Sequence, residues 1–274
     1  MLGKLIKNDF IGSSRSMSIV YLVAAISLAV TALSYAFKIT FLKIIGSLSL
    51  MLVVFGLVFI TIFLMMSYFN KTLYTDQGYL TYTLPVKSKD ILISKAIVSF
   101  VWLALSYIVL VGTVVGIAWY AKAKLGESLG GDVDMIFDSF SQLFSSGGLP
   151  TVAAIGKICI YGLIFGFVSI LIIVSEVFFS MTLSNVKGFN KMGFFGGILI
   201  FIVIYILVHI ISALVMVYAP ISLFISGDGI RLCLKSMYNV SNTFGVGGII
   251  VQALFAVGMF FGTNSLMSKK INLR

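Results

Sequence analysis

Few side chains in this sequence have the type and spacing that chemistry requires. There is one histidine, His209, and the two cysteines, Cys159 and Cys233, are too far apart for a zinc or redox motif. The patterns HExxH and GxSxG do not occur, and neither of the two Gly-Lys pairs, which end at Lys4 and Lys157, has the rest of a phosphate-binding loop. We therefore predict that the chain is not an enzyme and has no catalytic residue, no metal site and no cofactor of its own.

Three aspartates, Asp132, Asp134 and Asp138, lie close together within residues 126–148. Apolar residues recur there at helical steps, which predicts an amphipathic helix with the aspartates on its other face and toward its N-terminal end. Negative charge is favourable at that end of a helix. An acidic helix start is the simpler interpretation. A calcium site is the alternative, but the sequence lacks the ligand spacing of an EF-hand.

Three more titratable groups lie within or beside long apolar runs. His209 is deep in one run, either bonded to a neighbouring helix or acting as a proton carrier; we favour the hydrogen bond because no Asp, Glu or second His lies near it in the sequence. Lys157 and Glu176 stand at opposite ends of another run, where long side chains ordinarily reach out to water. So few charges inside apolar runs argue against an ion-coupled carrier.

The composition is that of a membrane protein. Hydrophobic residues make up 60% of the 274 residues and charged residues 10%, whereas about a quarter of a soluble domain is charged. An enzyme dissolved in the cytosol is therefore excluded. The net charge of +10 would suit a protein that binds nucleic acid, but the positions of the basic residues along the chain are explained by membrane topology, as shown below.

Uncharged runs of at least about 18 residues predict transmembrane helices. The first run is too long for a cleaved signal peptide and is expected to be a retained span, and Pro220 should end the fifth helix. We predict an all-α polytopic membrane protein forming a single transmembrane domain over 1–274. Its six transmembrane helices are expected at about 17–37, 44–69, 96–120, 151–180, 192–218 and 246–267.

The loops carry the basic charge unevenly. With both termini cytosolic, the inner segments hold twelve Lys and Arg and the outer segments, at 38–43, 121–150 and 219–245, hold six. The positive-inside rule therefore favours cytosolic termini. Topology explains the basic composition, with membrane lipid as a partner and no need for nucleic acid.

Two cytosolic segments are unusually apolar. Residues 1–16 carry apolar side chains at helical spacing, which predicts an interfacial amphipathic helix. This helix either only anchors the first span or has a further role. The loop at 70–95 has breaks at Gly78 and Pro85, a helix cap at Ser88, and several Tyr and Leu side chains. These side chains lie either in the lipid interface or in a groove on a partner.

Apolar and small residues inside the spans allow two further predictions. Phe55, Phe59, Phe63 and Met66 recur at helical steps and form a stripe that either lines a pathway for an apolar substrate or contacts lipid and other helices. Four GxxxG pairs lie within spans and would let helices approach closely. The pairs are Gly112 with Gly116, Gly162 with Gly166, Gly193 with Gly197, and Gly258 with Gly262.

Residues 73–95, with DQGYLTYTLPV at 76–86 and ILISK at 91–95, resemble a stretch of the permease subunits of type 2 ABC exporters from Gram-positive bacteria. The first ten residues are also similar to the N-terminus of that family. Gln77 stands where the family often has Glu, so any acidic role there falls to Asp76.

The resemblance implies a plasma-membrane permease that forms a homodimer, or a dimer with a close paralogue. Each copy would dock a separate ATPase through the loop at 70–95, and we expect Asp76, Gly78, Tyr79 and Pro85 to make that contact. ATP and Mg would bind the ATPase. Relatives export lipids, drugs, bacteriocins and amphipathic peptide toxins, so an apolar or amphipathic substrate is expected. The alternatives are a non-transporting sensor or immunity subunit and a secondary carrier.

Overall fold

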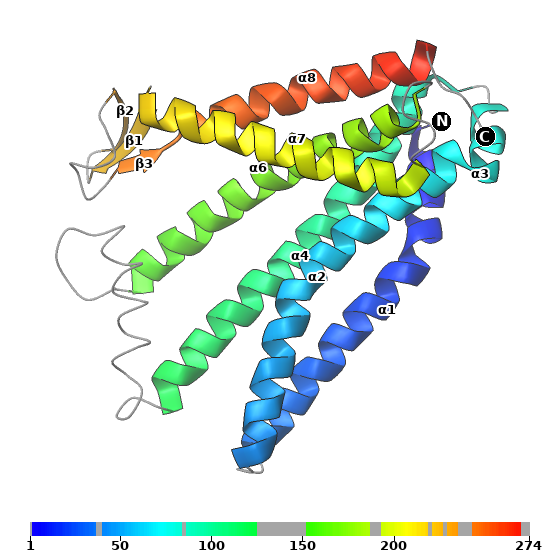
Figure 1. Ribbon diagram of the computed structural model, residues 1–274. Helices are drawn as coiled ribbons and strands as arrows, with labels where there is room; N and C mark the ends of the chain where they lie inside the picture. The colour runs from blue at the N-terminus through cyan, green and yellow to red at the C-terminus, as the bar shows by residue number, and fades with distance from the viewer. Residues whose placement is uncertain are drawn as a thin grey trace. The chain divides into compact units, whose positions relative to one another are not determined.

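The computed structural model describes residues 2–36, 40–83, 86–124, 152–186, 193–218, 221–226, 229–234 and 243–269. Long helices dominate these segments, with one short helix and three short strands (Figure 1). The helices are α1 (Leu2–Ala36), α2 (Thr40–Tyr74), α3 (Asp76–Thr83), α4 (Ser88–Lys124), α6 (Val152–Ser184), α7 (Gly193–Tyr218) and α8 (Gly247–Lys269).

Six of these helices, all but α3, are long and apolar enough to cross a membrane, which confirms the predicted number of spans and indicates a multi-pass membrane protein. Their outward-facing side chains fit that environment. On α7, Phe195, Val217 and Tyr218 are 77%, 72% and 83% exposed, as expected for a helix with lipid around it.

The N-terminal helix differs from the prediction, because no break separates an interfacial helix at 1–16 from a span beginning at 17. The helix α1 runs unbroken for 35 residues, about 52 Å at 1.5 Å per residue and so longer than the hydrocarbon core. Serine hydroxyls near the expected boundary donate to carbonyls of the same helix, Ser13 to Asp9 and Ser14 to Ile11. Their polar groups are thereby satisfied without ending the helix.

Helix ends follow several of the sequence signals. The helix α4 begins at Ser88, as expected to within one residue, but the cap position is that of Lys87, whose carbonyl accepts from the amides of Asp90 and Ile91 at 2.9 and 3.4 Å. The helix α7 ends at Tyr218, two residues before Pro220. Both α2 and α4 extend into the predicted loop at 70–95, so the part of that loop between them is short and contains α3.

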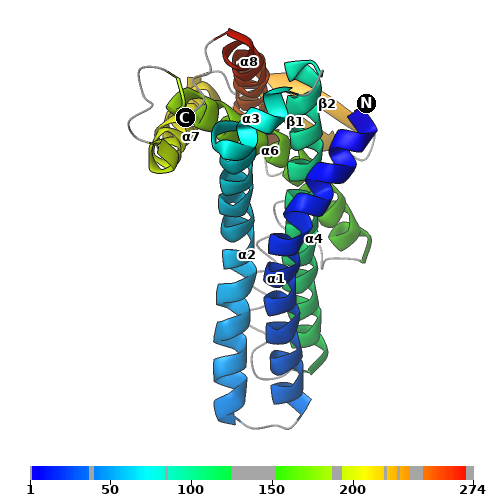
Figure 2. The same cartoon turned by 90° about the vertical axis from the view of Figure 1, so that its right-hand side faces the viewer.

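The chain divides into two compact units, and unit 1 comprises 1–113, 177–200 and 260–274. In it α1, α2 and α4 run side by side (Figures 1 and 2), with Met17, Met65, Val98 and Trp102 packed between them. The buried face of α1 is a stripe of mainly small and polar residues at helical steps. It comprises Asp9, Ser13, Met17, Ala24, Ser27 and Thr31.

A second contact within unit 1 joins the C-terminal ends of α2 and α6. The rings of Phe69 and Phe178 stack with centroids 4.2 Å apart. Beyond them the Tyr74 hydroxyl donates to Thr182 at 2.8 Å, and Asn185 of the turn after α6 donates to Asn70 at 3.2 Å. The end of α2 that leads into α3 is therefore firmly held.

Unit 2 comprises 114–176 and 201–259 and contains a three-stranded antiparallel sheet with strand order β2-β1-β3. The strands are β1 (Ile221–Ser226), β2 (Gly229–Leu234) and β3 (Thr243–Gly245), with Ser226 opposite Gly229. The sequence analysis missed this sheet in the segment 219–245. The runs ISLFIS and GIRLCL around a Gly-Asp-Gly turn are a hairpin signal.

The surroundings of four GxxxG glycines are described: two meet a close neighbour, as predicted, and two do not. A Cβ added to Gly197 would lie 2.5 Å from Sδ of Met181, and one added to Gly262 would lie 3.0 Å from the Phe179 ring. Gly112 and Gly258 have nothing within 4 Å. Gly193 instead begins α7 with a φ of 58°, a conformation that favours glycine.

Candidate functional site

A buried ion pair joins α1 to α4. The Nζ atom of Lys95 lies 3.0 Å from Oδ1 of Asp9, and the two side chains are 4% and 11% exposed. Asp9 reaches this position because it belongs to the buried stripe of α1, one turn before Ser13. Charged side chains are rarely buried within apolar helices without a role, so this pair marks the candidate site.

The Asp9 carboxylate has further partners on two helices. The Tyr68 hydroxyl of α2 donates to Oδ1 at 3.1 Å, and the Ser94 hydroxyl of α4 donates to Oδ2 at 2.7 Å. The Lys95 ammonium also lies 5.0 Å from the centroid of the Tyr68 ring. One carboxylate therefore binds α1, α2 and α4 together through charge-assisted hydrogen bonds.

Polar contacts continue from the ion pair toward the middle of the three helices. Trp102 donates from Nε1 to the Ser13 hydroxyl at 2.9 Å, and Phe10 stacks on the indole at 4.8 Å. Farther along, the Tyr21 hydroxyl donates to the Trp102 carbonyl at 2.9 Å and lies 2.8 Å from the Ser106 hydroxyl. These contacts fix how α1 packs against α4.

A cavity of about 580 Å³ lies beside the ion pair, within unit 1. Its walls come from α1, α2, α3 and α4, and twelve of its seventeen lining residues carry polar side chains. The lining residues are Leu5, Asn8, Asp9, Gly12, Ser13, Ser16, Met17, Leu64, Ser67, Tyr68, Lys71, Thr72, Gln77, Thr81, Ile91, Ser94 and Lys95.

The short helix α3 closes one side of this cavity with Gln77 and Thr81. The Thr81 hydroxyl donates to the Thr72 carbonyl of α2 at 3.0 Å. Gly78 is buried, and its amide donates to the Thr75 carbonyl at 2.7 Å in the turn that starts α3. A displacement of α3 would therefore act directly on the end of α2.

The structure brings together some residues of the predicted ATPase contact. Asp76, Gly78 and Tyr79 all lie on α3. Pro85 is outside the described residues, as are the three aspartates of the predicted outer helix, Asp132, Asp134 and Asp138.

The predicted stripe on α2 does not share one environment. Phe55, Phe59 and Phe63 are 53%, 72% and 50% exposed, whereas Met66 is buried. Phe69, one helical turn after Met66, stacks on α6, so α2 is covered at that level. The exposed part of the stripe ends at Phe63, whose ring meets that of Phe194 edge to face at 5.6 Å.

Two expectations about titratable groups are wrong. The hydrogen bond of His209 goes to the Tyr205 carbonyl in its own helix, at 2.9 Å, and not to a neighbouring helix. Glu176 does not reach water: it is completely buried, and neither carboxylate oxygen bonds to a described residue. The helix α6 continues to Ser184, two turns past Glu176, which keeps this side chain from the helix end.

Sequence reasoning missed the ion pair, although signals for it exist. Asp9 is the first acidic residue of the chain, and the next is Asp76. Asp9, Ser13 and Met17 recur at steps of four, which places the carboxylate on one face with a core methionine.

Within the described residues, no group of three His, Cys, Asp or Glu side chains is placed to hold a metal ion. Comparison with protein-family models, curated proteins and solved structures found no match to this chain.

Proposed function

We propose that this chain is the membrane-spanning permease subunit of an ATP-driven ABC exporter from a Gram-positive bacterium, in the plasma membrane. In this proposal a separate ATPase binds ATP and Mg and docks on α3. The pathway for an apolar or amphipathic substrate, such as a peptide, toxin, bacteriocin or lipid-like molecule, is formed with a second permease copy. The complex has two permeases and two ATPases.

The observation that carries the proposal is α3, a separate helix of eight residues between two spans. At the same end of unit 1 are the first turns of α1, the start of α4 and the end of α8 (Figures 1 and 2). In the proposal this end of unit 1 faces the cytosol, where the ATPase reaches α3. The Thr81–Thr72 hydrogen bond and the packed end of α2 give it a firm connection to the spans.

The composition of the spans supports an apolar or amphipathic substrate. On α2, Phe55, Phe59 and Phe63 expose aromatic surface, which adapts to varied apolar ligands. Within the described segments Asp9 and Lys95 form the sole salt bridge, and their charges neutralise each other. Along this exposed aromatic face of α2, a strongly hydrophilic substrate would find little to replace its hydration.

The test is to purify the chain with the ATPase it associates with in its native membrane, comparing Tyr79→Ala on α3 with Lys87→Ala just outside it. Loss of the ATPase, or of hydrolysis stimulated by an apolar peptide, in Tyr79→Ala alone would support docking through α3. Equal recovery and equal stimulation in both variants would refute it.

The same preparation separates the proposal from a non-transporting subunit. A sensor or immunity protein would retain the ATPase yet show no substrate-stimulated hydrolysis and no uptake into inverted vesicles. Cross-linking in native membranes tests the dimer. Recovery of monomers alone, with no related partner, would contradict it.

A further inference from the structure

The cavity beside Asp9 and Lys95 has the features of a binding site. Apolar voids in proteins stay empty, whereas roomy polar ones hold water or a ligand. Twelve of its lining residues carry polar side chains and five do not. Its volume of about 580 Å³ lies within the range of about 300–1,000 Å³ that small-ligand sites occupy.

The charge of this lining favours an anion. Lys71 and Lys95 oppose the single carboxylate of Asp9, which leaves one net positive charge. Asp9 already accepts from Lys95, Tyr68 and Ser94. The Lys95 ammonium donates once in the structure, to Asp9, and an ammonium has three donors. Two of its donors therefore have no hydrogen-bond acceptor among the described residues.

Hydroxyl groups surround these cations. The walls present serine, threonine and tyrosine hydroxyls from all four helices, together with the amides of Asn8 and Gln77. Such groups both donate and accept, so they suit a ligand that combines a phosphate with alcohol groups. The hydroxyl-bearing residues are Ser13, Ser16, Ser67, Tyr68, Thr72, Thr81 and Ser94.

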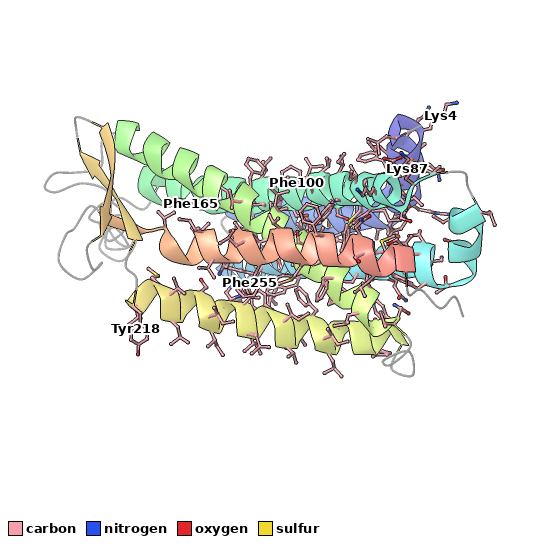
Figure 3. The ribbon with its side chains drawn as sticks, turned by 90° about the horizontal axis from the view of Figure 1, so that it is seen from above. Lys4, Lys87, Phe100, Phe165, Tyr218 and Phe255 are labelled. Atoms are coloured by element: carbon pink, nitrogen blue, oxygen red, sulfur yellow. The ribbon has the colours of Figure 1, made fainter. Side chains whose placement is uncertain are left out.

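The surroundings of the cavity favour a lipid as the source of that group. Exposed lysines gather at this end of unit 1, where Figure 3 shows Lys4 and Lys87, and basic groups beside apolar spans attract anionic lipid. Next to Gly12 of the cavity wall, Ile11 is 59% exposed. It offers an apolar surface on which an acyl chain can lie.

We propose that this cavity binds a phosphate-bearing polar group, supplied by the headgroup of an anionic phospholipid. Lys71 and Lys95 hold the phosphate and the hydroxyl lining holds the glycerol. Asp9 is a positioning residue that keeps the Lys95 ammonium at the cavity wall. This inference does not depend on the proposed transport function.

The experiment uses the full chain in neutral detergent, with phosphatidylglycerol, phosphatidylcholine or inorganic phosphate added. Thermal unfolding and native mass spectrometry report binding. Phosphatidylglycerol is expected to raise the unfolding midpoint and to remain bound, with phosphatidylcholine doing neither. Lys71→Gln should weaken phosphatidylglycerol binding about tenfold, the loss expected for one hydrogen bond to a charged group.

Two further variants locate the binding. Ser16→Leu narrows the cavity at an exposed position without changing its charge, and should also weaken binding. Lys89→Gln removes an exposed charge outside the cavity and should leave binding unchanged. Because Lys71 and Ser16 are not part of the Asp9 network, neither variant puts folding at risk.

Each outcome is decisive. If inorganic phosphate protects at the same concentration as phosphatidylglycerol, with the same loss in Lys71→Gln, the group is a free anion and the site stands. If neither ligand protects the wild-type chain, or if Ser16→Leu and Lys71→Gln bind phosphatidylglycerol as the wild type does, the proposal is overturned.

Discussion

Removing one member of the Asp9–Lys95 pair should destabilise the protein far more than removing a charge nearby. In Asp9→Asn the Lys95 ammonium keeps its buried position, 4% exposed, but loses the opposite charge. Breaking a buried pair in this way costs about 3–5 kcal/mol of unfolding free energy. The new amide still offers one oxygen acceptor, so the loss comes mainly from the uncompensated charge.

The converse change, Lys95→Met, should cost less. It leaves the Asp9 carboxylate with two hydroxyl donors, Tyr68 at 3.1 Å and Ser94 at 2.7 Å. Hydrogen bonds to a charged group contribute about 1.5–3 kcal/mol each, so the remaining charge is partly compensated. We expect Lys95→Met to cost about 1–2 kcal/mol less than Asp9→Asn, and the double variant to cost about 2–4 kcal/mol less than the sum of the two single variants.

The assay is unfolding of the purified chain by a denaturing detergent, followed by circular dichroism for the wild type, both single variants and the double variant. Lys89→Met and Asp90→Asn are matched controls in the first turn of α4, expected to cost less than about 1 kcal/mol each. Single variants no more damaging than these controls, or a double variant equal to the sum, would refute the assigned role of the pair.

Four other substitutions, two of them a matched pair, test separate parts of the structure in the same unfolding assay. Trp102→Phe keeps an aromatic ring against Phe10 but removes the donor to Ser13; we expect a loss of about 1–2 kcal/mol, and an unchanged midpoint would mean that this bond contributes nothing. Gly197→Ala places a Cβ 2.5 Å from Sδ of Met181 and should cost about 1–3 kcal/mol. The matched change Gly258→Ala, with nothing within 4 Å, should gain about 0.5–1 kcal/mol, and equal effects of the two would contradict the packing described. Glu176→Gln removes a carboxylate that has no hydrogen-bond partner among the described residues, and it should raise the free energy of unfolding by about 1–3 kcal/mol. A lower free energy of unfolding would contradict the absence of a partner for this carboxylate.

Apolar runs predicted the spanning helices because length and hydropathy are local properties of the chain. Pro220 and Ser88 likewise predicted helix ends from their own covalent structure. The unbroken α1 was harder to foresee, because Ser13 and Ser14 resemble breaking residues until their hydroxyls bond within the helix. In the same way, the apolar stripe on α2 could not show that Met66 is buried while Phe59 stays exposed.

The candidate site was less predictable, because it depends on which helices become neighbours. Asp9 and Lys95 are 86 residues apart, and each alone resembles an ordinary charge beside a span. Only the packing of α1 against α4 shows that they are partners. The burial of Glu176 was unpredictable for the same reason: the sequence shows that Glu176 lies near the end of an apolar run, but it does not show which residues surround it.

The sequence separation of the ion pair also has a consequence for synthesis of the protein. Asp9 enters the membrane with α1, long before the ribosome has made α4. Its first partner is the Tyr68 hydroxyl, available once α2 has inserted, and Ser94 and Lys95 arrive last. Until then the nascent chain carries a carboxylate without its cation. Completion of the pair thus marks the moment at which the first three spans become a finished unit.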